Sequence, residues 1–325
     1  MSKKNLSLLK WRAAALQTLR QFFDVRGYLE IQTRALRPST ATDPYVESFK
    51  SQWLFGSETL YLQPSPEFAH KIFLAEHFIP IYEVARVFRN EEHGTLHRSE
   101  FSLVEWYKPY ADYRALMSET FELVLAIAQN LGKERLEYKG CSVSLNKGYE
   151  ILRFRDAFER YTGFNPFALS DSELIEAANN IDCKVNPQWS RNDILNCILI
   201  DKIEEKLGFD RPCYLCDYPA SMASLARTKR DEDGFEFAER FELYALGVEL
   251  CNGYSELTDA KEQRRRFELD NIERRNLGYP TLPIDNELLS ALPKLGALAG
   301  NALGFERLLM LLLSCDDIAD LYLDY

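Results

Sequence analysis

Residues 88 to 101 read Phe88-Arg89-Asn90-Glu91-Glu92-His93-Gly94-Thr95-Leu96-His97-Arg98-Ser99-Glu100-Phe101, and this stretch decides the fold. Apolar and polar residues alternate before it and again after it. Alternation with a period of two on both sides of a polar segment with glycine predicts antiparallel strands over 81–89 and 101–107. The joining loop places arginines and histidines between carboxylates, a composition that can hold a triphosphate. A solvated hairpin with surface charges is the alternative interpretation.

The composition indicates a globular protein. The chain has 325 residues, of which 46% are hydrophobic, which is enough for a substantial core. The net charge of -11 argues against a surface that attracts nucleic acid as a whole, so binding of tRNA or DNA would need a concentrated basic patch or a basic appended domain, and neither is obvious. The N-terminus lacks the apolar core of a signal peptide, and no apolar run reaches membrane-spanning length. We therefore expect a cytoplasmic protein that does not bind a membrane.

Seven cysteines are scattered along the chain. Cys213 and Cys216 have the spacing of half a zinc or redox site, but they fall on an expected strand, where residues three apart point to opposite faces. No second pair completes a metal site. We expect reduced and mostly buried thiols.

The periodicity along the chain predicts alternating helices and strands, with strands near both ends of the sequence. This order favours an α+β fold with an antiparallel sheet flanked by helices. We expect one domain over 1–325 with a more helical insertion at about 130–210. The expected helices are 5–26, 64–76, 112–131, 191–207, 259–276 and 303–313. Further strands are expected at 28–31, 61–63, 213–217 and 239–254, irregular chain at 36–58 and a mobile charged loop at 227–234.

Residues 239 to 250 are expected to form a hairpin that turns near 245–247. With a two-residue turn, Glu242 and Glu249 would face each other directly, and two facing carboxylates repel. A divalent cation would remove this conflict, and carboxylate oxygens suit magnesium. A three-residue turn would shift the pairing, and two exposed acids on a solvent face are the alternative.

Two further segments carry candidate binding residues. Asn252 and Glu256 share strand parity, so they can line one face and bind an amino group, although Asn252-Gly253 can also form a simple turn. Gly300 to Arg307 is a glycine-spaced strand that runs into a very apolar helix. A charge in that helix must reach a partner, and a nucleotide would provide one for Arg307.

Together these segments resemble the motifs of class II aminoacyl-tRNA synthetases. Residues 26–31 are similar to motif 1, residues 88–91 and 97–101 to motif 2, and residues 300–307 to motif 3. Ser65-Pro66-Glu67, Glu105-Trp106-Tyr107, Tyr218-Pro219-Ala220 and residues 249–260 narrow the resemblance to the lysyl branch. Lysyl-tRNA synthetases begin with an anticodon-binding barrel, whereas the catalytic pattern here begins within the first few residues.

The chain is therefore similar to the stand-alone elongation factor P–(R)-β-lysine ligase family, which has no anticodon-binding domain. The resemblance implies a homodimer that activates (R)-β-lysine with ATP and Mg²⁺ as the adenylate. It also implies transfer of the lysyl group to a lysine of elongation factor P, with AMP and pyrophosphate as products and no tRNA.

The resemblance also assigns roles to residues. Arg89, at the ATP α-phosphate, and Arg307, at the adenine or γ-phosphate, would be catalytic, while Glu242 and Glu249 would hold magnesium. The remaining ATP-binding residues would be Asn90, Glu91, His97, Arg98, Phe101, Glu249, Leu250 and Gly304. The substrate-binding residues would be Ser65, Pro66, Glu67, Tyr107, Asn252, Glu256 and Ala302. The Ala302 methyl stands where lysyl-tRNA synthetases have glycine, so it could favour the β-amino isomer.

Four other positions depart from the family pattern. Arg34 replaces the proline of motif 1, and Arg98 replaces an ATP-contacting asparagine. Asn301 stands at an apolar position of motif 3, and Cys251 replaces a small residue beside the pocket. Two other interpretations remain open. One changes the acceptor: a tRNA-independent or truncated lysyl-tRNA synthetase that uses α-lysine. The other is a non-catalytic amino-acid-binding paralogue, which the changes at Arg34, Arg98 and Asn301 favour. A basic cluster of Lys261 with residues 264–266 is a candidate docking surface for the acidic partner, or else a solvated helix face.

Overall fold

A nine-stranded sheet forms the centre of the molecule. The computed structural model describes residues 3–52, 56–90 and 93–322. The order of the strands is β1-β5-β6-β14-β13-β12-β10-β9, and β11 pairs with β12 at one end. In this spatial order the strands are β1 (Leu29–Glu30), β5 (Ile81–Phe88), β6 (Glu100–Pro109), β14 (Leu298–Gly304), β13 (Val248–Ser255), β12 (Glu236–Ala245), β10 (Cys213–Pro219) and β9 (Glu150–Arg153), with β11 (Thr228–Arg230) beside β12.

The six inner strands, from β5 to β10, are antiparallel. The expected α+β class is therefore confirmed, but the sheet is mixed because the outer pairs β1–β5 and β9–β10 are parallel. The hairpin of β5 and β6, which the alternation on both sides of the polar loop predicts, is confirmed with Val84 opposite Val104.

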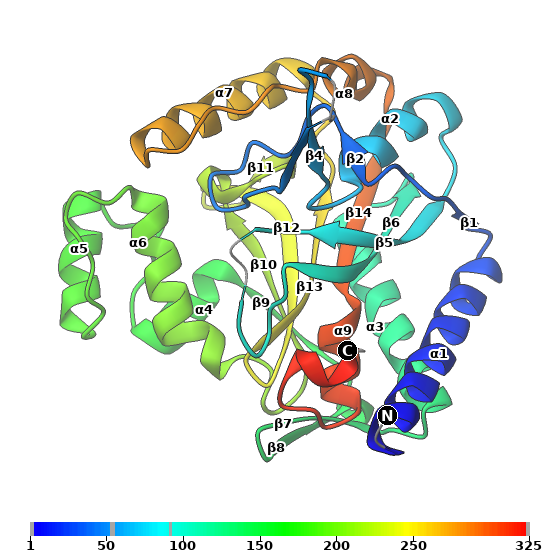
Figure 1. The fold of residues 1–325 in the computed structure, drawn as a ribbon. Coiled ribbons are helices and arrows are strands. Elements are labelled where there is room, and N and C mark those ends of the chain that lie inside the picture. Colours follow the sequence, from blue (N-terminus) through cyan, green and yellow to red (C-terminus); the bar gives the residue numbers. More distant parts are fainter. Residues whose placement is uncertain (1–2, 53–55, 91–92, 323–325) are drawn as a thin grey trace.

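One face of the sheet is covered by α1 (Lys3–Asp24), α3 (Tyr113–Asn130) and α9 (Phe305–Leu312) (Figure 1). Tyr82, Trp106 and Phe241 point from neighbouring strands into this layer, where they join apolar side chains of the three helices. Trp106 is completely buried. This face is the main hydrophobic core, and residues of opposite strand parity must point to the other face.

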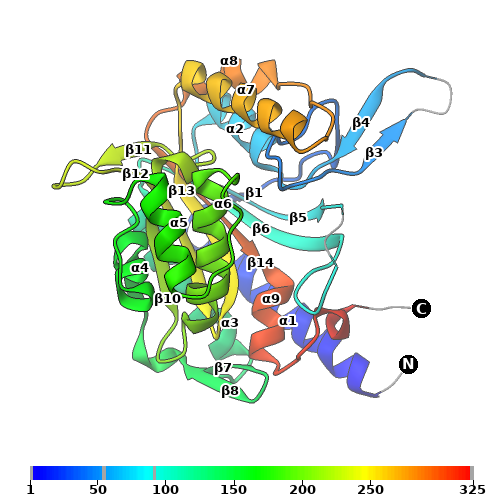
Figure 2. The same cartoon turned by 90° about the vertical axis from the view of Figure 1, so that its left-hand side faces the viewer.

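The other face is covered in two separate parts. At one end lie α2 (Glu67–His77), α7 (Ala260–Asn276) and α8 (Asn286–Ala291), and beside β9 and β10 lie α4 (Phe154–Thr162), α5 (Asp171–Asn180) and α6 (Arg191–Ile198) (Figure 2). The two groups form separate hydrophobic clusters around Leu288 and Phe158 respectively. The strip of sheet between them carries most of the polar side chains that the sequence singled out.

The structure shows where several of the expected helices begin. Asp112 caps α3 by accepting the N–H groups of Arg114 and Ala115, and Asp259 caps α7 in the same way. The helix expected at 64–76 begins at Glu67, with Pro66 as its N-cap residue. The last expected helix begins two residues later than predicted, at Phe305, because the strand β14 continues to Gly304.

Other expectations were wrong in detail. The segment 36–58 is not simply irregular, because β2 (Leu36–Arg37), β3 (Lys50–Gln52) and β4 (Thr59–Leu62) form a small sheet. The loop at 227–234 contains strand β11. The helix expected at 191–207 leaves α geometry after Ile198 and continues as a π-helical turn over Leu199–Ile203. A second small sheet pairs β7 (Arg135–Tyr138) with β8 (Cys141–Ser144).

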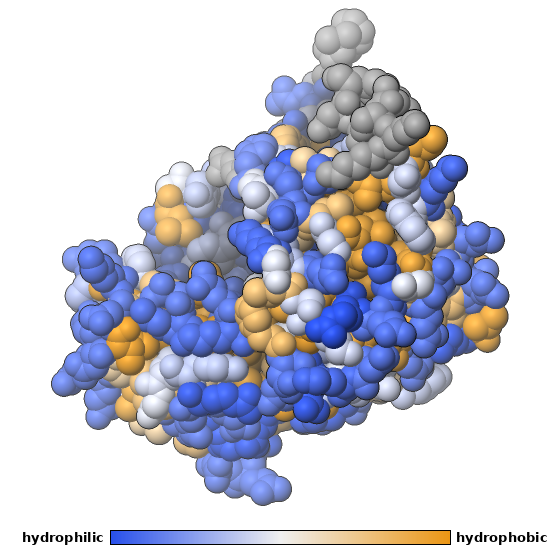
Figure 3. Space-filling view, turned by 90° about the horizontal axis from the view of Figure 1, so that it is seen from below, coloured by the Kyte–Doolittle hydropathy of each residue, from blue (hydrophilic) through white to orange (hydrophobic). Residues whose placement is uncertain are grey.

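The surface and the cysteines agree with a globular chain. The face seen in Figure 3 is largely hydrophilic, with hydrophobic residues in separate patches. No helix in the described ranges has the length and apolar character needed to cross a membrane. Cys213 and Cys216 belong to different hydrophobic clusters, which confirms that they point to opposite faces of β10.

Candidate active site

Residues that are distant in sequence form a transverse row on the open strip of the sheet. Directly opposed residues of neighbouring strands share a face, so the pairing register places their side chains next to each other. Across β5, β6, β14, β13 and β12 the row is Glu83, Glu105, Ala302, Asn252 and Glu242. Two residues further along, a second row is Tyr107, Gly300, Tyr254 and Arg240. Asn252 therefore lies within a strand and not in a turn.

Arg307 joins the beginning of α9 to the neighbouring loop and strand. Its Nη1 donates to the backbone oxygen of Glu249 at 3.0 Å and to the Glu249 Oε2 atom at 3.2 Å. Its Nε donates to the backbone oxygen of Leu96, and its Nη2 lies 2.7 Å from His97 Nε2. Arg307, a charged residue in an apolar helix, therefore has partners within the protein: Glu249, the backbone of Leu96, and His97 of the β5–β6 loop.

Arg89 is the second arginine near Glu249. Its guanidinium lies over the ring of Phe101, with its carbon 5.2 Å from the ring centroid. Arg307 contacts the Glu249 carboxylate, and the positive charges of both Arg307 and Arg89 oppose the burial and the Glu242 charge that raise the pKa of Glu249. The chain thus brings Arg89, Glu249 and Arg307 together, as the resemblance to class II synthetases implied.

The other ATP-binding candidates have different surroundings. Asn90 donates its N–H to the backbone oxygen of Glu47. Arg98 donates to the backbone oxygen of Gly94 and to Asp317 Oδ1 at 3.1 Å, so its guanidinium is held near the end of the chain. The peptide oxygen of Leu250 faces the open side of Gly304. Glu91 lies outside the described residues.

Glu242 and Glu249 do not face each other directly, so that expectation was wrong. The hairpin turns at Leu246 and Gly247, one residue later than direct pairing of the two acids requires, and an extra residue on β13, Leu250, moves the partner of Glu242 by one further position. Glu242 is therefore opposite Asn252, and Glu249 is opposite Tyr244. The two carboxylates are nevertheless close enough that the charge of Glu242, after burial, is the largest cause of the raised pKa of Glu249.

Glu242 has a complete set of hydrogen-bond donors. Its Oε1 accepts from Arg240 at 2.5 Å and from Asn252 at 3.1 Å, and its Oε2 accepts from Tyr218 at 2.5 Å and Tyr244 at 2.7 Å. A carboxylate has about four acceptor positions. A metal ion would have to displace one of these donors to bind Glu242, whereas 37% of the Glu249 side chain is exposed.

The pair still fits a divalent cation that a nucleotide brings with it. Magnesium is commonly bound by one or two carboxylates, with phosphates and water completing the shell. Within the described ranges no group of three or more acidic, histidine or cysteine side chains could hold a metal by itself. The register places Glu242 and Glu249 on one face of the sheet, and the repulsion between these two carboxylates favours a cation here.

The amino-acid side of the site contains an internal lysine. Lys71 Nζ lies 2.5 Å from Glu67 Oε1 and 2.6 Å from Glu256 Oε2, so an ammonium of the chain bridges two expected substrate-binding carboxylates. Lys71 is fully buried. Burial alone would lower its pKa, but the charges of Glu256 and Glu67 raise it. The pocket is therefore built to bind an ammonium group.

A third carboxylate completes the pocket. Glu105 is 2% exposed, its Oε2 accepts the hydroxyl of Ser65 at 2.7 Å, and its Oε1 accepts the hydroxyl of Tyr107 at 2.9 Å. The Ser65 hydroxyl in turn accepts the N–H of Glu67 at 3.0 Å. Burial, followed by the charge of Glu105, raises the pKa of Tyr107 well above 10, so this phenol remains a donor.

Glu256 has an acceptor available to a ligand. While its Oε2 binds Lys71, its Oε1 is buried and has no hydrogen-bond partner among the described residues. Burial raises the pKa of Glu256 to about 8, opposed by Lys71 and reinforced by the negative charge of Glu67. A buried acceptor without a donor is costly, and an ammonium of a ligand would satisfy it.

Gly300 leaves the space that this pocket needs. A methyl group at Gly300 would lie 2.4 Å from Cε1 of Tyr107 and 2.5 Å from Oε1 of Glu256. Ala302 lies two residues along, between Glu105 and Asn252 in the transverse row. Asn301 points to the opposite face, where it is 2% exposed and donates to Thr120 of α3. This departure from the family pattern therefore does not touch the site.

Several residues of the site were missed in the sequence. Lys71 lies one helical turn after Glu67, and this spacing in a helix was a signal that could have found it. Arg240 has the strand parity of Glu242, which was also visible. His70 and Glu83, which are in contact at 2.8 Å, gave no local signal because their proximity depends on how α2 packs on β5.

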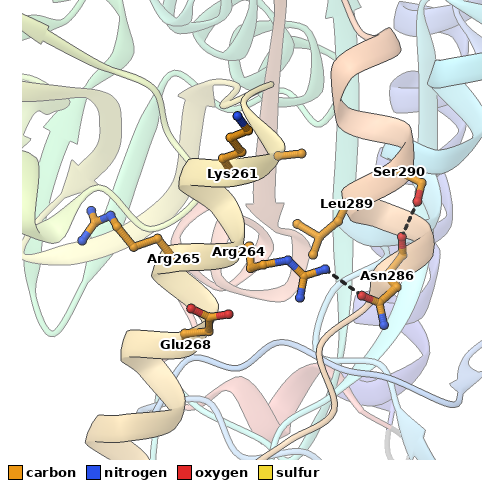
Figure 4. Close-up of a pocket in the computed structure, with 8 residues that line it drawn as sticks. Lys261, Arg264, Arg265, Glu268, Asn286, Leu289 and Ser290 are labelled. Carbon is orange, nitrogen blue, oxygen red and sulfur yellow. Dashed lines mark hydrogen bonds between the residues drawn. The ribbon is translucent and has the colours of Figure 1, made fainter.

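A separate pocket lies between α7 and α8. It has a volume of about 360 Å³ and is lined mainly by polar and charged side chains (Figure 4). Lys261 and Arg264 line it, and Arg264 donates to Asn286 at 2.9 Å. Arg265 and Arg266 both bind Glu262, and Arg266 also donates to the backbone oxygens of residues 224 and 226. The basic cluster is thus only partly available to a partner.

Comparison with known proteins identifies the class to which this fold and site belong. A family model described as tRNA synthetases class II (D, K and N) matches residues 1–323. The chain is therefore a member of the class II tRNA synthetases, which use ATP.

Curated relatives define the family more closely. A protein of Haemophilus influenzae (strain PittGG) is 37% identical over 97% of this chain and 93% of its own length. Proteins of Proteus mirabilis and Photorhabdus laumondii are 37% and 38% identical over the same shares. All three are named elongation factor P--(R)-beta-lysine ligase. The chain belongs to the family of elongation factor P–(R)-β-lysine ligases.

Proposed function

We propose that this protein activates (R)-β-lysine with ATP and transfers the lysyl group to a lysine side chain of elongation factor P. The observation that carries the proposal is a pocket of three carboxylates, the buried Glu105 and Glu256 and the largely buried Glu67. It lies on the sheet that also carries Glu249, to which the Arg307 guanidinium donates. The carboxylates suit a substrate with two ammonium groups, and the guanidinium suits a triphosphate.

The reaction needs no nucleophile from the protein. The carboxylate of the substrate attacks the α-phosphorus of ATP, and pyrophosphate leaves as the adenylate forms. Arg89 stabilises the negative charge that develops at the α-phosphate, and Arg307 with His97 positions the nucleotide. The amine of the acceptor lysine then attacks the adenylate, an amide bond forms and AMP leaves.

Magnesium is the metal that we propose for this site. Glu249 would hold it through its partly exposed carboxylate, and Glu242 would do so directly, in place of one of its hydrogen-bond donors, or through a water molecule. When bound, the ion neutralises the phosphate charge of ATP. Equilibrium dialysis with Mn²⁺ and ATP should show weaker metal binding for Glu249→Gln than for the unaltered protein.

The partner and the assembly are also proposals. Lys261 and Arg264, in the pocket between α7 and α8, offer a positive surface to an acidic elongation factor P. Reversing both charges should slow transfer and leave adenylate formation intact. We propose a homodimer, whose apolar surface would include Leu29 and Leu36, 47% and 43% exposed on short strands. Light scattering after size-exclusion chromatography would test the dimer.

We also propose that the protein is cytoplasmic, because its proposed substrates are ATP and a translation factor.

The decisive experiment uses mass spectrometry of elongation factor P. The factor is incubated with the enzyme, ATP and either (R)-β-lysine or α-lysine, and a mass increase of one lysyl group is expected with the β isomer. Dominant activation of α-lysine together with charging of tRNA would overturn the proposal, as would the absence of AMP with either isomer. Ala302→Gly should increase the use of α-lysine, because the methyl between Glu105 and Asn252 narrows the pocket.

A further inference from the structure

Two buried carboxylates lie directly opposite each other on neighbouring strands, next to the amino-acid pocket. Glu83 of β5 and Glu105 of β6 are cross-strand partners and are 4% and 2% exposed. Like charges in directly opposed positions repel, and the repulsion is strongest where water is excluded. Glu105 hydrogen-bonds Ser65 and Tyr107, so the charge state of this pair bears on the pocket.

One imidazole lies between the two carboxylates. His70 of α2 is completely buried, with Nε2 2.8 Å from Glu83 Oε2 and Nδ1 3.6 Å from Glu105 Oε1. The edge of its ring meets Tyr107, with ring centroids 5.5 Å apart. Glu83 is anchored on its other oxygen by the N–H of Thr33 at 3.1 Å.

The geometry favours a protonated ring. If Nε2–H donates to Glu83, a neutral His70 would turn the lone pair of Nδ1 toward the Glu105 carboxylate, whereas an imidazolium turns an N–H toward it. The Nδ1 atom has no hydrogen-bond partner within the described part of the chain. Burial lowers the pKa of His70, but the neighbouring carboxylates of Glu105 and Glu83 outweigh it and raise the pKa.

We propose that His70 is a positioning residue of the amino-acid pocket, which holds Glu105 as an oriented carboxylate by placing an imidazolium between Glu105 and Glu83. The inference rests on the proposed function for the identity of the ligand. His70 itself touches neither substrate nor ATP, since it lies behind Glu105 and Tyr107.

The proposal also accounts for the charge of the pocket. Two adjacent residues of α2 supply its two cations, and four buried or nearly buried carboxylates surround them. When all four carboxylates are ionised, as we expect with a ligand bound, the four negative and two positive charges leave a net charge of −2, which matches the two ammonium groups of a diamino acid. The six groups are Glu67, Glu83, Glu105, Glu256, His70 and Lys71.

The test compares three variants over pH 6.5 to 8.5. His70→Leu leaves the two carboxylates facing each other, so they share a proton at neutral pH and bind an ammonium poorly. We expect the KM for (R)-β-lysine to rise about 10- to 100-fold at pH 7, the loss typical of one charged hydrogen bond, with kcat and the KM for ATP changed by less than about threefold. His70→Leu with Glu83→Gln removes the repulsion and should restore the KM to within about threefold. His77→Leu, at an exposed position of the same helix, is the matched control.

The pH profile separates positioning from a structural role. In His70→Leu the KM should fall more steeply with rising pH than in the unaltered protein, because the proton shared by Glu83 and Glu105 is lost in addition to the proton of Glu256, which both proteins lose over this range. An unchanged KM in His70→Leu would overturn the inference, and so would a raised KM that neither pH nor Glu83→Gln improves. Should His70→Leu not fold, the double variant carries the test, since its loss of affinity would equally contradict the inference. If the unaltered protein activates no lysine isomer, the proposed function itself fails.

Discussion

Adding one methyl group at Gly300 should disable the amino-acid pocket and spare the nucleotide site. In Gly300→Ala the new carbon lies 2.4 Å from Cε1 of Tyr107, whereas ordinary contacts begin at 3.4 Å, so the ring must retreat by about 1.0 Å. Glu256 Oε1, at 2.5 Å, must move as well. Both side chains are buried and bonded to neighbours, so neither can move freely.

The expected cost follows from these displacements. Overpacking of this kind destabilises a protein by about 1–3 kcal/mol. A misplacement of about 1 Å in a binding group can cost about 100-fold in reaction efficiency. We therefore expect the KM for the amino acid in ATP–pyrophosphate exchange to rise about 10- to 100-fold, with the KM for ATP nearly unchanged.

Gly304→Ala provides a matched comparison on the same strand. Its nearest neighbour would be Cδ of Arg307 at 3.7 Å, which is an ordinary contact. This variant should keep the amino-acid KM and show any effect on the KM for ATP, because its neighbours are Arg307 and Leu250. Equal amino-acid KM values for Gly300→Ala and the unaltered protein would refute the reasoning, provided that thermal unfolding shows both to be folded.

Three other predictions concern the charged groups. Arg307→Lys should raise the KM for ATP more than tenfold in pyrophosphate exchange, because a single ammonium cannot replace a guanidinium that contacts Leu96, His97 and Glu249 together; a normal KM for ATP would contradict this role. Lys71→Met removes one partner of a buried ion pair and should cost about 3–5 kcal/mol in unfolding free energy, part of which saturating substrate restores. The pKa of Glu256 is raised to about 8 on folding, so the folded state binds more protons than the unfolded state between about pH 4.5 and 8. Stability without ligand should consequently fall as pH rises through this window in thermal unfolding, and calorimetry should detect proton release when the diamino acid binds.

The sequence predicted local features well and missed those that depend on packing. The β5–β6 hairpin, the strand that leads into α9 and the convergence of Arg89, Glu249 and Arg307 followed from alternation, glycine spacing and the family motifs. The register between Glu242 and Glu249 did not, because the alternation over residues 239–250 does not show that the turn falls at Leu246 and Gly247, one residue later than direct pairing of the two acids requires.

Short strands and the partners of buried side chains also could not be predicted from the sequence. β11 has only three residues and is a strand because β12 offers it an edge. His70 looks like any helical histidine until α2 packs it against Glu83 and Glu105. Tertiary contacts, and not local propensity, decide both cases.

The transverse row restricts how this protein can evolve. Its five members come from five strands. Loss or gain of one residue within β14 or β6 would move every following side chain to the opposite face of the sheet, so pocket residues would point into the hydrophobic core and core residues into the pocket. Lineages can therefore alter their choice of amino acid only by exchanging side chains in place, as at Ala302. Length variation should accumulate instead in the connections, where no register has to be kept.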